Sequence, residues 1–302
     1  SLGLVVMMIS VATGVGLQHK IREKLAGFNG HIQITSFQNT TEEITDRPLS
    51  VNQDFYPDFK EVSGIEHMQV YATKFGLFRT DESFQGIVFK GIDSAYDWQF
   101  FQEYLQRGVL PDLGDELTQE VLISKIVADA MRLDLGDKIS TFFIKADVNK
   151  LPNRRIFEVV GIYDTGYKEF DENLVFGDIR HIQRLNKWGP SEVGGFEVLL
   201  EDFDAIQSKG VEIYESLPPE MTSSTIYEDF PEIFDWLALF DNNIILILVI
   251  MVMIAGINMI TALLVLILER AQMIGILKAM GAADKSIAKI FLYNAAYLIL
   301  IG

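Results

Sequence analysis

The sequence predicts a membrane protein in which transmembrane α-helices carry a large extracytoplasmic α+β domain on a helical stalk. The 302 residues are 49% hydrophobic and 22% charged, which is too apolar for an ordinary soluble domain and too charged for a bundle of spans. The apolar residues gather in three runs, and most charges lie between the first two. The net charge of −17 repels phosphate backbones, so nucleic acid is excluded as a partner.

The clearest predicted span is residues 244–268, which contain no charged side chain. At about 1.5 Å per residue this stretch exceeds the ~30 Å hydrocarbon core of a bilayer, so it predicts a complete transmembrane helix. Residues 1–17 and 287–302 are apolar runs at the two ends of the chain. They predict the C-terminal part of a first transmembrane helix and the start of a third, and the sequence is therefore expected to be a fragment of a longer membrane protein.

Charge is distributed unequally around these spans. Residues 18–242 hold 21 Lys and Arg against 40 Asp and Glu, a net charge of −19. The short connection 269–289 holds four basic and two acidic residues, a net charge of +2. Short loops rich in Lys and Arg stay in the cytoplasm, whereas long domains translocate largely regardless of charge. We therefore expect the large acidic domain outside the cytoplasm and the short connection inside it.

Two helical stalks are expected to join the large domain to the spans. Residues 18–30 place apolar side chains on one helix face, and residues 225–243 carry an apolar stripe that runs unbroken from Ile226 to Phe240, with Pro231 tolerated in a first turn. Between the stalks, alternating and turn-rich segments predict short strands and helices. The expected strands include 31–35, 85–89 and 157–162, and the expected helices are 125–133 and 179–187, capped by Ser124 and Asp178. The expected segment boundaries are 1–17, 18–30, 31–224, 225–243, 244–268, 269–286 and 287–302.

No constellation of side chains predicts catalysis by this chain. The absence of cysteine excludes disulfides, Cys-based zinc sites, iron–sulfur clusters and thiol catalysis. The four histidines are scattered, so no metal site is expected. Ser286 and Lys289 have the spacing of serine–lysine acyl enzymes, but this short pattern arises by chance and lies at a membrane entrance. The phosphate-binding pattern GxxxxGK[ST] is absent, so the chain is not expected to be an enzyme or to hydrolyse ATP itself.

Two side chains of the 244–268 span are candidates for lining a cargo path, Met251 and Asn258. A polar side chain in hydrocarbon needs a partner, so Asn258 either bonds to a neighbouring helix or contacts cargo. Met251 either packs against helices and lipid or contacts cargo. The sequence leaves both alternatives open.

The connection between the last two spans is the most informative segment. Its apolar residues recur at i, i+3, i+4 and i+7 and predict a short helix with one apolar face; they are Met273, Ile276, Leu277 and Met280. Gly281 suits a left-handed helix stop, and Asp284 is placed to cap the next helix. Such a helix either lies flat in the lipid interface or docks in a groove on a soluble partner, and residue chemistry alone does not separate the two.

Residues 269–282 resemble the ER-x-x-x-IGIL-[KR]-A-x-GA signature of the FtsX-like permeases, the membrane subunits of type VII ABC systems. Residues 27–34, 121–138 and 157–171 are similar to stretches of the lipoprotein-releasing permeases of the LolC and LolE type within that superfamily. The resemblance covers essentially the whole chain. It implies a type VII ABC permease in the bacterial inner membrane, with a MacB-like periplasmic domain.

The resemblance further implies that the 270–280 helix is a coupling helix seated on a separate ABC ATPase. The implied coupling residues are Glu269, Arg270, Met273, Ile276, Leu277, Lys278, Met280 and Gly281. Met273 departs from the family, since many members carry an acid there, which puts an ion pair at that position in doubt but not the apolar seat. ATP and Mg would bind to the partner ATPase and no cofactor to this chain. Two permeases would pair, as a homodimer or a heterodimer.

In that family, LolC-type subunits also carry a hairpin that hooks a periplasmic carrier protein. The matching place here is residues 145–155, and the candidate carrier-binding residues are Lys150, Pro152, Arg154 and Arg155. An ordinary surface hairpin is the alternative.

The expected function is ATP-driven release of lipoproteins from the outer leaflet of the inner membrane toward a periplasmic carrier. Cargo would enter between residues 2–17 of one permease and residues 244–268 of the other. Extracting acyl chains costs about 0.8 kcal/mol per buried CH₂, which explains a need for ATP. The alternatives are a macrolide or peptide efflux permease, an FtsX-like signalling module that activates a cell-wall hydrolase, and an exported enzyme tethered by helices.

Overall fold

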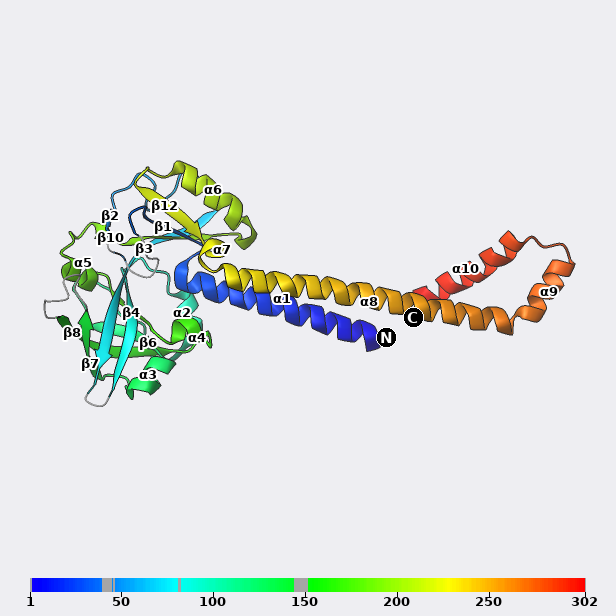
Figure 1. The fold of residues 1–302 in the computed structure, drawn as a ribbon, viewed down its shortest axis with the longest axis horizontal. Coiled ribbons are helices and arrows are strands. Elements are labelled where there is room, and N and C mark those ends of the chain that lie inside the picture. Colours follow the sequence, from blue (N-terminus) through cyan, green and yellow to red (C-terminus); the bar gives the residue numbers. More distant parts are fainter. Residues whose placement is uncertain (1, 40–44, 46, 81–82, 144–151, 302) are drawn as a thin grey trace. The chain divides into compact units, whose positions relative to one another are not determined.

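The structure is a computed structural model that describes residues 2–39, 45, 47–80, 83–143 and 152–301 (Figure 1). Its contacts divide the chain into two compact units, which we describe separately. The helical unit comprises residues 1–19 and 232–302, and the sheet unit comprises residues 20–231.

The sheet unit is built on a ten-stranded mixed sheet. The strands are β1 (Ile32–Ser36), β3 (Ile65–Arg79), β4 (Phe84–Ile92), β5 (Leu105–Gly108), β6 (Glu120–Ser124), β7 (Lys138–Phe143), β8 (Asn153–Tyr163), β9 (Leu174–Asp178), β11 (Gly195–Leu200) and β12 (Met221–Thr225). Their order is β12-β1-β11-β3-β4-β9-β6-β8-β5, and β7 pairs with both β3 and β8. This double pairing closes β3, β4, β9, β6, β8 and β7 into a ring. A separate two-stranded sheet joins β2 (Leu49–Ser50) and β10 (Glu192–Val193).

The burial of each strand follows its residue pattern. Every residue of β9 is buried, as expected for a run of apolar and small residues covered on both faces. By contrast, β1 alternates between buried and half-buried positions, as its sequence alternates. The strands expected at 31–35, 85–89 and 157–162 are confirmed as β1, part of β4 and part of β8.

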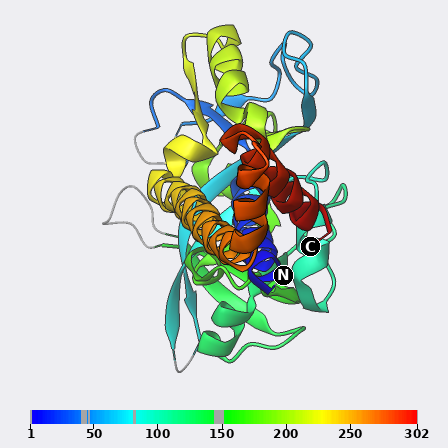
Figure 2. The same cartoon turned by 90° about the vertical axis from the view of Figure 1, so that its right-hand side faces the viewer.

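Short helices connect these strands. They are α2 (Gln99–Tyr104), α3 (Lys125–Met131), α4 (Lys168–Asp171), α5 (Arg180–Asn186), the 3₁₀ turn η1 (Phe203–Ala205), α6 (Ile206–Ser216) and α7 (Ile226–Asp229). The predicted cap of α3 is confirmed, since the Ser124 hydroxyl accepts the Val127 N–H at 3.0 Å. Helix α6 packs on β12, at the top of the view in Figure 2.

The cap predicted for α5 is only partly right. The N-cap position is Ile179, one residue later than Asp178, and no side chain caps it. Asp178 nevertheless accepts the Arg180 N–H at 2.9 Å, and the Arg180 guanidinium also donates to the same carboxylate. The ion pair holds the aspartate in place at the start of the helix.

The core of the sheet unit is unusually aromatic. A buried cluster surrounds Phe28, at the end of α1, and includes Tyr71, Tyr96, Phe101, Tyr163 and Phe176. Several of their rings meet edge to face, for example Phe28 against Phe101 at 5.5 Å. The end of α1 is therefore part of the core.

The helical unit contains α1 (Leu2–Asn29) up to residue 19, α8 (Pro231–Glu269), α9 (Ala271–Ala279) and α10 (Asp284–Ile301). Helices α1 and α8 are side by side in this unit, where the Gln18 side-chain amide donates to the Leu237 carbonyl at 3.2 Å (Figure 1). Within the described residues, α8 is the one helix that is long and apolar enough to cross a membrane.

The expectation of an unbroken helix from Ile226 to Phe240 is wrong. Helix α7 ends at Asp229, Phe230 leaves the helical conformation with φ −127° and ψ 54°, and α8 begins at Pro231. The proline ring disfavours the α conformation of the preceding residue, whereas proline itself is favoured in the first helical position. The second connection between the two units is thus broken at Phe230.

Candidate functional site

The candidate coupling segment, residues 269–281, forms the turn after α8 and the whole of α9. Glu269 is the last residue of α8, and Arg270 occupies the bend with φ −100° and ψ 9°. The bend keeps its backbone hydrogen bonds, because Arg270 N–H donates to the Leu266 carbonyl and Ile274 N–H donates to the Arg270 carbonyl. The segment is therefore a hydrogen-bonded corner and not an open loop.

The predicted stop at Gly281 is confirmed. Gly281 has φ +90°, a conformation that glycine adopts without a steric penalty. Its N–H donates to the Lys278 carbonyl and the Ala282 N–H donates to the Leu277 carbonyl, both at 3.0 Å. These two bonds form a Schellman motif, which satisfies carbonyls that the end of a helix leaves free.

The structure places the four predicted apolar residues on α9 or at its end, and none of them is buried by the rest of the described chain. Ile276 is 56% exposed and Met280 is 71% exposed, while Leu277 is half-buried. A helix that leaves such a face uncovered needs another surface to bury it. The geometry is compatible with both of the expected surfaces, a lipid interface and a protein groove.

Asp284 does not cap α10 as predicted. It is the first residue of that helix, and the Ala283 carbonyl accepts the first helical N–H bonds, from Ser286 and Ile287. The Asp284 carboxylate instead pairs with Lys278 at 2.8 Å, which connects the end of α9 with the start of α10. Its negative charge still lies in the first turn, where the helix dipole favours it.

Three of the candidate carrier-binding residues, Pro152, Arg154 and Arg155, lie at the start of β8. Strands β7 and β8 are antiparallel with Phe143 opposite Asn153, and residues 144–151 of the predicted hairpin lie outside the described residues. Lys150 lies outside the described residues. Pro152 is exposed just before β8.

Arg154 and Arg155 are adjacent on β8, so their side chains point to opposite faces of the hairpin. Arg154 is exposed and donates to the Ser140 hydroxyl at 2.8 Å. Arg155 is half-buried, and its partner across the ladder is the buried Thr141. The sequence grouped the two arginines, but the structure assigns only Arg154 to the exposed face, where Ile156 is also exposed.

The two cargo-path candidates lie on α8. Met251 is half-buried and Asn258 is exposed. Because they are seven residues apart, they share one face of the helix about two turns from each other. The structure thus brings together two residues that the sequence singled out separately.

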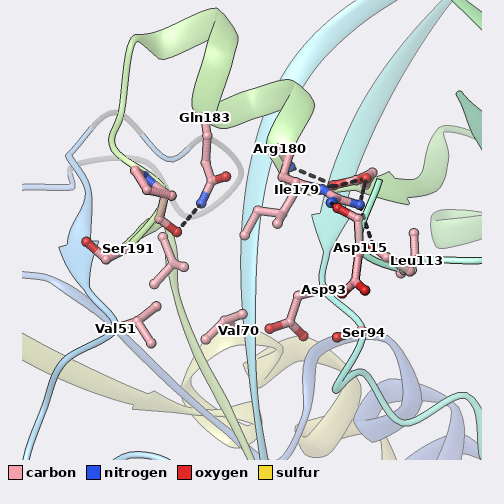
Figure 3. Close-up of a pocket in the computed structure, with 14 residues that line it drawn as sticks. Val51, Val70, Asp93, Ser94, Leu113, Asp115, Ile179, Arg180, Gln183 and Ser191 are labelled. Carbon is pink, nitrogen blue, oxygen red and sulfur yellow. Dashed lines mark hydrogen bonds and ion pairs between the residues drawn. The ribbon is translucent and has the colours of Figure 1, made fainter. Parts of the chain in front are cut away.

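A cavity of about 430 Å³ in the sheet unit was not anticipated from the sequence (Figure 3). It is lined by residues of β3, β9, β10, α5 and several loops, among them Asp93, Ser94, Arg180 and Ser191. The Arg180 guanidinium already donates to Asp178 and to the carbonyls of Gly114, Asp115 and Glu116. It has little capacity left for an anion. No local motif could reveal a site that is assembled from segments so far apart.

Burial raises the pKa of the Asp93 carboxyl in this cavity above its usual value. The carboxylate accepts the Ala95 N–H at 3.0 Å. Among the residues that the structure describes, no group of three His, Asp or Glu side chains could hold a metal ion.

Comparison with known proteins gives one family match in the C-terminal part of the chain and several similar proteins. Residues 245–302, which include α9 and most of α8, match the family model described as FtsX-like permease C-terminal. LolC of Neisseria meningitidis, named a lipoprotein-releasing system transmembrane protein, is 22% identical over 98% of this chain and 71% of its own length. LolC of Haemophilus influenzae is 24% identical over 69% of this chain, which spans about half of that relative.

Solved structures with a similar fold include the periplasmic region of MacB from Actinobacillus actinomycetemcomitans. It is 16% identical, with a TM-score of 0.44, and the match covers 67% of this chain and 91% of that one. The extracellular domain of YknZ, a noncanonic ABC-type transporter from Gram-positive bacteria, is 16% identical with a TM-score of 0.42 over 64% of this chain and 99% of that one.

The family match at residues 245–302 and the similarity to LolC support an ABC transporter permease of the FtsX-like type. Among the relatives compared, its sequence is similar to LolC, over nearly its full length. The predicted resemblance and the predicted α+β domain are thus confirmed, and the structure adds that the sheet of this domain is mixed. The number of membrane spans stays a prediction.

Proposed function

We propose that this chain is a permease subunit that passes the work of a separate ABC ATPase to its outer domain and so releases lipoproteins from the outer leaflet of the inner membrane. A periplasmic carrier would receive them. The observation that carries the proposal is the uncovered apolar face of α9, which lies inside the region that matches FtsX-like permeases. The relatives named lipoprotein-releasing proteins supply the cargo class.

Force would enter at α9 and leave through the long helices. ATP and Mg would bind to the ATPase, whose closure would displace α9. Helix α8 continues without a break over 39 residues, which corresponds to roughly 58 Å at 1.5 Å per residue. A continuous helix moves its far end when its near end is pushed, so this subunit needs no ATP chemistry of its own.

In this proposal the large domain lies in the periplasm and the coupling segment in the cytoplasm of a bacterial cell. A second permease, identical or related, completes the cargo path. Met251 and Asn258 would line that path from one face of α8, where the thioether and the amide would meet the acyl chains and the polar linkage of a lipoprotein.

The docking of α9 is tested by Leu277→Asp in the reconstituted complex of permease and ATPase. A charge in the centre of a buried apolar seat removes a contact worth about 2 kcal/mol or more, so ATPase coupling should fall at least tenfold while the permease still inserts. The matched control is Ala271→Asp, which places the same charge on the opposite, exposed side of α9. Unchanged coupling in the Leu277→Asp complex would refute the protein-docking proposal.

The hairpin is tested by carrier pull-down. The double variant Arg154→Glu and Arg155→Glu should weaken capture of a lipoprotein carrier, and the single variant Arg154→Glu should account for most of the loss because Arg154 lies on the exposed face. Normal capture of the carrier by the double variant would show that these residues are an ordinary surface and do not bind the carrier. Activation of a cell-wall hydrolase in trans, with no carrier bound, would support the signalling alternative instead.

A further inference from the structure

A buried lysine meets the end of α1 inside the sheet unit. Lys90 lies on β4, and its side chain is 3% exposed. Its ammonium donates to the Phe28 carbonyl and to the Glu197 carboxylate, the latter at 2.5 Å. Glu197, on β11, is fully buried. The pair therefore joins the last turn of α1 to two strands that flank β3.

The surroundings satisfy both charges. The second oxygen of Glu197 accepts the Gln69 side-chain amide at 2.9 Å, and the Gln69 carbonyl oxygen accepts the Asp97 N–H at 2.9 Å. Aromatic rings face the ammonium at 5.4 to 5.9 Å; they belong to Tyr71, Tyr96 and Phe176. Burying two charges is costly unless they are paired and hydrogen-bonded, and here each Glu197 oxygen accepts one hydrogen bond and the Lys90 ammonium donates two.

The position of the lysine is what distinguishes this pair from a general stabilising contact. The Phe28 carbonyl belongs to the last turn of α1, where carbonyls lack intrahelical partners and carry the negative end of the helix dipole. A buried ammonium at that place caps the helix from within the sheet unit. The Phe28 ring is also fully buried and stacks on Phe170 at 4.4 Å, so this residue is held at both its backbone and its side chain.

We propose that Lys90 and Glu197 are positioning residues that fix the end of α1, residues 20–29, to the sheet, so that this end of the helix and the sheet move as one body. The inference rests on the proposed function, because a permease that transmits force through α1 needs a rigid attachment between the end of this helix and the sheet. Two other ion pairs also attach α1 to this unit, Lys20 with Glu103 and Arg22 with Asp204, but the carboxylate of each is more than half exposed.

The test measures the attachment directly, in the full chain. The sequence has no cysteine, so spin labels on Lys20→Cys and Gln119→Cys report one distance without background. Lys20 lies on α1 about 12 Å before Phe28, and Gln119 is exposed just before β6. The double variant Lys90→Met and Glu197→Gln removes both charges together and so avoids leaving one charge buried alone. The matched control, Lys209→Met with Glu212→Gln, removes an ion pair that lies within α6.

In the Lys90→Met, Glu197→Gln protein, the label distance distribution should broaden at least twofold, and lipoprotein release should fall at least fivefold at unchanged ATPase rate. The control should keep the parent distribution and release. A label distance distribution as narrow in the double variant as in the parent protein would refute the proposal that Lys90 and Glu197 hold the end of α1. A broadened distribution with parent-like release would equally overturn its role in transmission while leaving the proposed function in place. If the parent protein itself releases no lipoprotein, the proposed function fails, and the distance measurement still decides whether Lys90 holds α1.

Discussion

The two connections that leave the sheet unit are built differently. Helix α1 runs from Leu2 to Asn29 without a break and ends in the aromatic core. The return connection is divided at Phe230 into the short α7 and the long α8, because Pro231 follows. A helix interrupted before proline bends more easily than a continuous one. The first connection therefore ends packed in the core of the sheet unit, whereas the second contains a break.

The contacts of the two connections agree with this distinction. Phe28 is fully buried, and its carbonyl is held by Lys90. Phe230 is half-buried, and its ring meets Phe170 at 5.7 Å. Instead of a buried charge, α7 has a capping box, in which the Glu228 carboxylate accepts the Thr225 N–H at 2.7 Å. A cap of this kind stabilises a helix start but does not attach it to a core.

The largest expected effect compares the two phenylalanines. Phe28→Ala opens a cavity in the core and should lower the free energy of unfolding of the sheet unit by about 3–5 kcal/mol. Phe230→Ala removes a half-buried ring and should cost about 1 kcal/mol. Urea unfolding followed by the fluorescence of Trp98 and Trp188 measures both. Equal costs would contradict the distinction between the connections.

A smaller effect is expected on the stability of the sheet unit at low pH. His31, which follows α1, is half-buried, and this burial lowers its pKa to about 4; its Nδ1 also accepts the Leu200 N–H at 2.8 Å, which requires the neutral ring. Because the pKa of His31 in the folded protein lies below the ordinary histidine value of 6.5, this contribution to stability is present above pH 6.5 and is lost as the pH falls toward 4. The loss is at most about 3 kcal/mol.

Urea midpoints across this pH range check the acid effect. His31→Asn keeps an acceptor near the Nδ1 position but cannot become charged, so its stability should fall less between pH 6.5 and pH 4 than that of the parent. Parallel curves for the two proteins would show that His31 is not the source of the acid sensitivity.

The smallest effect is expected at the second connection. Thr225→Ala removes the capping box of α7 and should cost about 1 kcal/mol. Hydrogen exchange of α7 should accelerate while that of α1 stays unchanged. Ser224→Ala, one residue earlier in β12, serves as the control. Faster exchange in α1 as well would mean that the two connections are not independent.

Local features could be predicted from the sequence because their causes are local. Gly281 follows an apolar repeat and stops α9 as expected, and Ser124 caps α3. The break before Pro231 was also signalled locally, since the residue before a proline avoids the helical region, but the apolar stripe on both sides suggested continuity. Here the conformational restriction on Phe230, the residue before Pro231, outweighed the apolar side-chain pattern that favoured a continuous helix.

Features that depend on distant residues could not be predicted. Lys90 and Glu197 are 107 residues apart in the chain, and neither belongs to a local motif. The cavity beside Arg180 is likewise assembled from separate loops. The strand geometry that separates Arg154 from Arg155 was available in principle, because alternation along β8 sends neighbouring side chains to opposite faces.

The most direct test of the proposed function is the sidedness of single-cysteine variants in intact cells, Lys278→Cys in α9 and Asp58→Cys in the sheet unit. Both positions are exposed, and the natural sequence has no cysteine to interfere. A membrane-impermeant maleimide added from outside, once the outer membrane has been made permeable, should label Asp58→Cys and leave Lys278→Cys unlabelled until the inner membrane is opened. Labelling of both positions from the same side would contradict a permease that receives force at α9 and delivers it across the membrane.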